Sequence, residues 1–178
     1  GGCAIGSRPV NLHLFALKKL GAKIKIKNGY IIAEAKKGLR GTKIFFPSIS
    51  VGATENAILA AFNSKGKTIL SNCAVEPEIQ DLIKFLNKLG GKIKLIGRKI
   101  FIQGCEKIKK SIKHEIIFDR IELGTYVVAA ALVGKKISFN KIDPKIIKNE
   151  INILKKMGVK LRIQKNSLEV LKSNNIKK

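Results

Sequence analysis

The chain has 178 residues, of which 45% are hydrophobic, enough to build a folded core in one or two domains. Its formal net charge of +24 at pH 7 comes mainly from lysines that are spread along the whole chain. Tryptophan is absent, aromatic residues make up only 6%, and no apolar run has the length of a membrane span. Since nucleic-acid readers favour arginine and aromatic side chains, we expect a solvated basic surface, with neither nucleic acid nor a membrane as partner.

The first nine residues form a glycine-rich segment that contains Cys3 and Arg8. Glycines let the backbone approach a ligand closely, Cys3 offers a titratable sulfur, and Arg8 offers a planar cation suited to phosphate or carboxylate. Pro9 suits the first position of a helix, whose free N–H groups add to anion binding. A lone cysteine is more often a small buried hydrophobic residue, so the segment by itself leaves both interpretations open.

One pattern recurs along the chain: a helix end, a glycine, and two alternating strands around a tight turn. It predicts hairpins at residues 22–35, 91–103 and 159–171. The preceding helices are expected to begin at Pro9, Pro77 and Pro144. Gly21, Gly90 and Gly158 recur every 68 or 69 residues, which suits a repeated βαβαββ unit.

Two alanine-rich helices are predicted at residues 51–62 and 122–132, followed by strands at 68–71 and 136–140. Alanine-rich helices pack closely, so they suit the interior of a structure whose sheets lie outside. The alternation of helices and strands predicts an α/β fold.

A further strand, predicted at residues 43–46, runs into the first of these helices through a short turn. The turn residues that could offer free N–H groups to a diphosphate are Ser48, Ile49, Ser50, Val51 and Gly52. An ordinary turn capped by Ser50 explains the same sequence, and the residues alone favour that interpretation.

Cysteines and histidines give no metal-site pattern. Cys3, Cys73 and Cys105 are widely spaced, and His13 and His114 stand apart from one another and from any carboxylate cluster. We therefore expect no structural metal and a reducing, cytoplasmic setting.

The segment GGCAIGSRPVNLH at residues 1–13 closely resembles the active-site loop of the UDP-N-acetylglucosamine 1-carboxyvinyltransferase family of enolpyruvyl transferases. SVGATENAILAA (50–61), EPEIQDLIKFLNKLG (76–90) and DRIELGTYVVAAAL (119–132) also look like that family, in the same order. The resemblance implies an inside-out α/β barrel of repeated βαβαββ units in two domains. On that basis residues 1–117, with the active-site loop at 1–9, belong to the first domain, and residues 118–178 open the second. We expect the chain to be an internal fragment that has no turnover alone.

The activity implied by the resemblance is transfer of the enolpyruvyl group of phosphoenolpyruvate to the 3-hydroxyl of UDP-N-acetylglucosamine. Phosphate is released, no cofactor is needed, and the reaction is the first committed step of peptidoglycan precursor synthesis. Cys3 would be the general acid toward the methylene carbon of phosphoenolpyruvate and the residue alkylated by fosfomycin.

The resemblance also implies a set of substrate-binding residues. These are Arg8, Pro9, Val10, Asn11, Leu12, His13, Ser48, Ile49, Ser50, Val51 and Gly52. The family usually has an acidic residue in place of Asn11 and a lysine in place of Ser48. Glu76, Asp119 and Arg120 fall in motifs near the cleft or hinge, although helix capping or a salt bridge explains them equally well.

Three alternatives remain open. The shikimate-pathway enolpyruvyl transferase shares the barrel but lacks the loop cysteine. An RNA 3′-phosphate cyclase would suit the positive charge, but its nucleotidyl-accepting histidine motif is not recognisable. The third alternative is a noncatalytic basic binding module.

Overall fold

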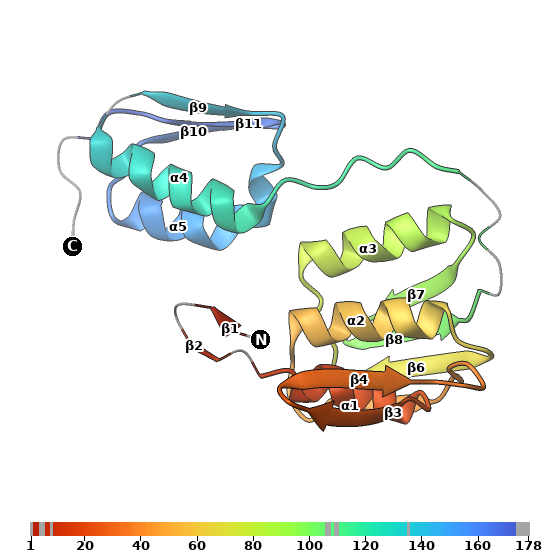
Figure 1. Ribbon diagram of the computed structural model, residues 1–178. Coiled ribbons are helices and arrows are strands. Elements are labelled where there is room, and N and C mark those ends of the chain that lie inside the picture. Colours follow the sequence, from red (N-terminus) through yellow and green to blue (C-terminus); the bar gives the residue numbers. More distant parts are fainter. Residues whose placement is uncertain are drawn as a thin grey trace. The chain divides into compact units, whose positions relative to one another are not determined.

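The computed structural model describes residues 2–3, 6–7, 9–105, 108, 111–134 and 136–173. The chain has a mixed α/β fold and divides into two compact units, Gly1–Glu115 and Ile116–Lys178 (Figure 1). Within the described part of the chain, no helix has the length and hydrophobicity needed to cross a membrane.

Among the residues that the structure describes, the first unit carries three helices and three sheets. Its elements in chain order are β1 (Gly2–Cys3), β2 (Gly6–Ser7), α1 (Asn11–Lys19), β3 (Lys23–Lys27), β4 (Tyr30–Glu34), β5 (Lys43–Phe45), α2 (Val51–Phe62), β6 (Lys67–Ser71), α3 (Pro77–Lys88), β7 (Lys92–Ile96) and β8 (Lys99–Gln103). The main sheet has the order β5-β6-β8-β7, with β5 parallel to β6 and the other pairs antiparallel. β1 pairs with β2, and β3 pairs with β4, in separate two-stranded sheets.

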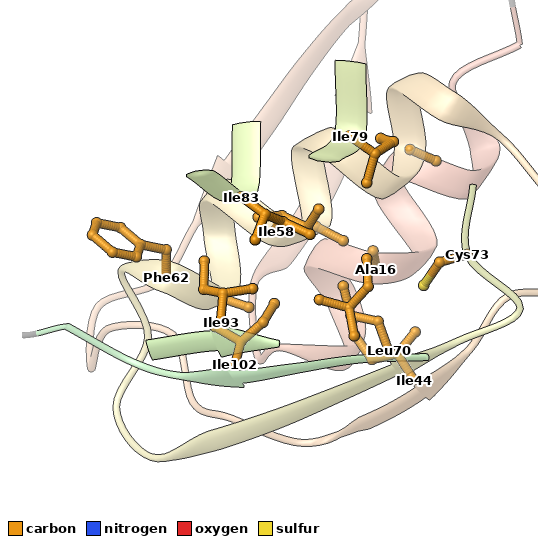
Figure 2. Packing of buried hydrophobic residues seen from close by; sticks show 14 of the residues in the cluster. Ala16, Ile44, Ile58, Phe62, Leu70, Cys73, Ile79, Ile83, Ile93 and Ile102 are labelled. Atoms are coloured by element: carbon orange, nitrogen blue, oxygen red, sulfur yellow. The ribbon is translucent and has the colours of Figure 1, made fainter. Parts of the chain in front are cut away.

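The main sheet buries one face and exposes the other, as the alternation of its residues requires. Ile44, Leu70 and Ile102 point to the buried side, whereas neighbours such as Lys43 and Lys94 are exposed. Figure 2 shows the buried side chains from the strands facing those from α2 and α3, including Ile58 and Ile83. α2 contacts α1 as well as α3, and its fully buried alanines are Ala53, Ala57 and Ala61. These small residues let the neighbouring helices approach closely.

The turn between α2 and β6 is fixed by backbone hydrogen bonds from two other segments of the chain. Gly41 N–H donates to the carbonyl of Lys65 at 2.7 Å, and Gly104 N–H donates to the carbonyl of Gly66 at 2.9 Å. A Cβ at Gly41 would collide with the backbone of Lys67, and one at Gly104 would collide with the carbonyl of Ser64. We call these bonds around residues 64–67 the glycine clasp.

The second unit is a two-layer structure. Its elements are α4 (Arg120–Val133), β9 (Ile137–Asn140), the 3-10 helix η1 (Pro144–Ile147), α5 (Lys148–Lys156), β10 (Leu161–Gln164) and β11 (Ser167–Val170). The strands form an antiparallel sheet of order β10-β11-β9, with α4 and α5 on one face (Figure 1). Val127, Ile147 and Leu168 are completely buried between the layers.

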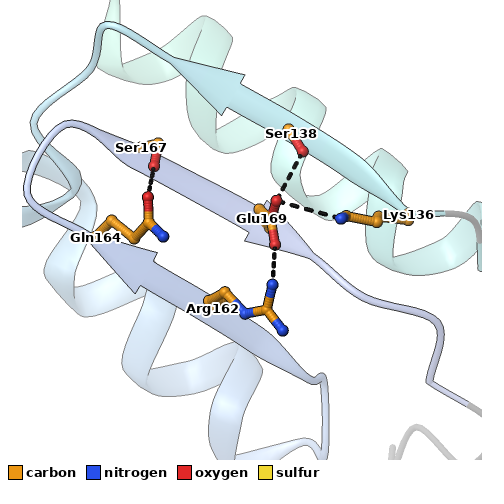
Figure 3. A network of polar contacts seen from close by, with 6 residues as sticks. All are labelled: Lys136, Ser138, Arg162, Gln164, Ser167 and Glu169. Carbon is orange, nitrogen blue, oxygen red and sulfur yellow. Dashed lines mark hydrogen bonds and ion pairs between the residues drawn. The ribbon is translucent and has the colours of Figure 1, made fainter.

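A network of charged and polar side chains lies on the sheet of the second unit (Figure 3). Glu169 accepts from Arg162 Nη1 at 3.1 Å and from Ser138 Oγ at 3.3 Å, and Lys136 Nζ lies 3.4 Å away. Desolvation raises the pKa of Glu169, but the hydrogen bond and charge of Lys136, the charge of Arg162 and the Ser138 hydrogen bond outweigh it. The pKa of Glu169 therefore lies below its usual value. These contacts link all three strands.

The structure confirms the three predicted hairpins, which are β3–β4, β7–β8 and β10–β11. It also confirms the helix at 51–62, whereas the second alanine-rich helix, predicted at 122–132, is longer at both ends. The predicted helix start at Pro9 is wrong: α1 begins at Asn11, because Val10 occupies the N-cap position and its carbonyl receives the Leu14 N–H. Pro77 does begin α3, and Pro144 begins the 3-10 turn η1, which leads into α5.

Candidate functional site

The start of α1 packs against the start of α2, so the structure brings together residues from the two predicted substrate-binding segments. The Nδ2 atom of Asn56 lies 3.1 Å from Nδ1 of His13. The His13 ring also lies over Gly52, where a Cβ would stand 3.3 Å from Cε1 and 3.5 Å from Nε2. His13 is therefore half-buried in a helix contact rather than turned into solvent.

The turn that precedes α2 is fixed by local hydrogen bonds. Ser50 Oγ accepts from the Ala53 N–H at 3.3 Å, so its hydroxyl caps α2. Thr54 Oγ1 donates to the Ser50 carbonyl at 2.7 Å and accepts from the Ala74 N–H at 3.1 Å. The capped-turn interpretation of Ser50 is thus correct for its side chain, and it leaves a ligand role for the turn open. Ser48 and Ile49 are exposed on this turn.

A carboxylate at the start of α3, that of Glu78, lies close enough to Glu55 on α2 to affect its pKa. Burial raises the pKa of Glu55 on α2, the nearby carboxylate of Glu78 on α3 raises it further, and His13 on α1 lowers it in part. Glu78 in the first turn of α3 and His13 in the first turn of α1 are therefore both within electrostatic range of Glu55. Glu76, one of the predicted cleft residues, turns its Oε2 back to accept from the Val75 N–H at 2.7 Å.

The segment that carries Cys3 leads directly into α1. β1 and β2 pair with Gly2 opposite Ser7 and with Cys3 opposite Gly6, so the segment folds back on itself. The side chain of Cys3 and the whole of Arg8 lie outside the described residues. The roles of Cys3 and Arg8 therefore stay predictions. Pro9, Val10 and Asn11, which follow, are exposed, and Leu12 packs partly against the core.

Asp119 and Arg120 belong to the second unit. Asp119 Oδ1 accepts from the N–H groups of Ile121 at 2.7 Å and Glu122 at 3.2 Å, which makes Asp119 the N-cap of α4. Helix capping, offered as an alternative from the sequence, is therefore the role its side chain has here. Arg120 is half-buried and lines a cavity of about 400 Å³ together with residues of α4 and Glu150.

His114 has a partner that the sequence analysis did not indicate. His114 Nε2 lies 3.1 Å from both carboxylate oxygens of Asp81, and the two side chains are only 9% and 12% exposed. The ring of His114 also meets Phe85 edge-on, with centroids 5.3 Å apart. Asp81 and His114 are 33 residues apart and Asn56 and His13 are 43 apart, so no local pattern could have indicated either pair.

The environment of Cys73 makes its thiol unreactive. Cys73 is completely buried, and burial raises its pKa to about 11, so it is a poor nucleophile at neutral pH. Among the residues that the structure describes, no three His, Cys, Asp or Glu side chains are grouped so that they could hold a metal ion.

The sequence profile of the EPSP synthase (3-phosphoshikimate 1-carboxyvinyltransferase) family matches residues 1–178. The chain belongs to this family. A UDP-N-acetylglucosamine 1-carboxyvinyltransferase of Pelagibacter ubique is 53% identical over 178 residues, which cover 99% of this chain and 42% of the relative. The enzyme of the same name from Endomicrobium trichonymphae is 47% identical, over 99% of this chain and 44% of its own. The chain thus spans less than half the length of these relatives.

Solved structures share the fold of this EPSP synthase family chain. The enolpyruvyl transferase NikO from Streptomyces tendae superposes with a TM-score of 0.79 at 21% identity, over 93% of this chain and 42% of that one. EPSP synthase from Acinetobacter baumannii gives a TM-score of 0.70 at 20% identity, over 93% and 40%. At these identities the likeness concerns the fold alone.

Proposed function

We propose that the protein containing this chain transfers the enolpyruvyl group of phosphoenolpyruvate to the 3-hydroxyl of UDP-N-acetylglucosamine and releases phosphate. The observation that carries the proposal is the contact between the starts of α1 and α2, where His13 meets Gly52 and Asn56. Two separate segments that resemble substrate-binding segments are adjacent in space, at helix starts that favour anions. The names of the relatives from Pelagibacter and Endomicrobium support the same substrate.

Within this proposal Cys3 is the general acid toward the methylene carbon of phosphoenolpyruvate, and Arg8 holds phosphate. The sugar nucleotide lies along the start of α1 (residues 9–13) and the turn before α2 (48–52). The exposed Ser48 and Ile49 face a bound nucleotide, while Ser50 keeps the helix start in shape. Phosphoenolpyruvate and UDP-N-acetylglucosamine are the only partners that the proposal requires, and the reaction belongs to the cytoplasm.

The proposal extends to the architecture. We take the two units as parts of the two domains of an inside-out α/β barrel built from βαβαββ units, and the order β5-α2-β6-α3-β7-β8 is consistent with one such unit. In the second unit, α4 exposes large apolar side chains that an interior helix would bury. These are Ile121, Tyr126, Val128, Leu132 and Val133. Further units of the barrel would cover them.

The test is phosphate release by the protein produced at the full length of its relatives, with phosphoenolpyruvate and UDP-N-acetylglucosamine together. We expect turnover that needs both substrates, and none when shikimate 3-phosphate replaces the sugar nucleotide. Turnover with shikimate 3-phosphate alone would refute the proposal. Residues 1–178 alone are expected to give no turnover.

Cys3 provides the sharper test of mechanism. Replacing a general acid by a group that cannot donate a proton near neutral pH costs about 100-fold or more in rate, so Cys3→Ser should lose activity on that scale. Fosfomycin should alkylate Cys3 first, as peptide mass mapping would show. Cys105→Ser is the matched control and should keep both activity and alkylation. Near-normal turnover of Cys3→Ser would remove Cys3 from the mechanism.

A further inference from the structure

Asn56 is a polar side chain beside the candidate site to which the sequence analysis assigned no role. It lies on α2 one turn after Gly52, and its amide nitrogen Nδ2 is 3.1 Å from Nδ1 of His13. Both residues are half-buried, so this bond is partly shielded from water. The contact joins α1 to α2 through a side chain that the proposed nucleotide site contains.

The amide nitrogen Nδ2 of Asn56 faces Nδ1 of His13. An amide NH₂ group donates, and with Nδ2 as the donor the Nδ1 atom of His13 accepts with its lone pair. The proton of the neutral imidazole is then on Nε2. The Cε1–Nε2 edge of the ring lies over Gly52, in the first turn of α2, where a side chain of any size would crowd it.

We propose that Asn56 is a positioning residue that holds His13 as the Nε2–H tautomer, so that Nε2 donates a hydrogen bond to a diphosphate oxygen of the sugar nucleotide. This inference rests on the proposed function. Glycine at position 52 leaves room for the ring, and Asn56 sets which nitrogen carries the proton. The start of α2 adds its own N–H groups, so donors from the ring and from the helix converge on one anionic group.

The tautomer is measured without substrate. In protein labelled with ¹⁵N-histidine, the nitrogen shifts of His13, assigned by comparison with His13→Gln, should show the proton on Nε2. In Asn56→Asp a carboxylate faces Nδ1, so Nδ1 should gain a proton. An Nδ1–H tautomer in the unchanged protein would overturn the inference.

Kinetic constants distinguish a positioning role of Asn56 from a general loss of structure in the variants. Losing one hydrogen bond to the nucleotide should raise KM for UDP-N-acetylglucosamine about tenfold in Asn56→Asp and Asn56→Ala, with kcat within about twofold. The matched control is Asn63→Asp, which makes the same change at the exposed far end of α2 and should leave KM unchanged. Unchanged KM in both Asn56 variants would overturn the inference. Absence of any turnover with UDP-N-acetylglucosamine would instead refute the proposed function, because the tautomer is read independently.

Discussion

Replacing His114 by alanine should destabilise the first unit, because it leaves the carboxylate of Asp81 buried without its imidazole partner. The pair is close, at 3.1 Å from Nε2 to both oxygens, and Asp81 is only 12% exposed at its side chain. Removing the hydrogen-bond partner of a buried carboxylate costs about 3–5 kcal/mol, because the carboxylate is left uncompensated. Since about a tenth of each side chain remains in contact with water, we expect the lower end, about 3 kcal/mol.

His114→Ala also removes the edge-on contact between the His114 ring and Phe85, which adds to the loss of stability. Asp81→Asn keeps an acceptor for Nε2–H and should cost less, about 1–2 kcal/mol. If the two groups act on each other as the geometry indicates, the double variant should cost less than the sum of the single ones by at least about 1 kcal/mol.

Urea unfolding of the 178-residue chain measures these differences, and thermal unfolding should show a midpoint lowered by about 6–12 °C for His114→Ala. Lys113→Ala, at the exposed neighbouring position, is the matched control and should change little. A cost below about 1 kcal/mol for His114→Ala, or strictly additive single variants, would show that the pair does not hold residues 111–115 to α3.

Two further predictions depend on pH. The pKa of Cys73 is raised from 9.0 to about 11, so the stability that comes from its neutral thiol is complete below pH 9 and is lost as pH rises through 11. Iodoacetamide at pH 8 should therefore label Cys105 well before Cys73, and equal labelling rates in the folded protein would contradict this. The pKa of Glu169 is lowered below 4.5, so its contribution to the second unit is present above pH 4.5 and is lost as pH falls through the lower value. Glu169→Gln should flatten that acid limb in thermal unfolding between pH 3 and pH 7; a limb of unchanged steepness would show that Glu169 does not cause it.

The helices and hairpins could be predicted from local sequence features. Glycine after a helix and alternation around a tight turn were sufficient to locate the hairpins, and Ser50 and the alanine spacing were sufficient to bound α2. The helix start at Pro9 failed because a proline fits equally well two residues before a helix. Only the structure shows that Val10 is the N-cap.

The site was predictable only in part, because its parts come from distant segments. The sequence identified the start of α1 and the turn before α2 as candidates, but not that His13 would lie over Gly52 or bind Asn56. Likewise, Asp81 interrupts the apolar face of α3, and nothing near it in the sequence indicated that His114 would satisfy it. Contacts of this kind depend on how the helices pack, which periodicity alone does not specify.

The glycine clasp has a consequence for how this stretch of chain can be rearranged. Gly41 lies just before β5 and Gly104 just after β8, and both bond to adjacent carbonyls of one turn, those of Lys65 and Gly66. The two ends of the segment 41–104 are therefore neighbours in space, although the whole four-stranded sheet lies between them in sequence. Segments with adjacent ends tolerate circular permutation and insertion into other chains. A short connection could therefore join residue 104 to residue 41, provided that both glycines are kept and that α1 still packs against α2.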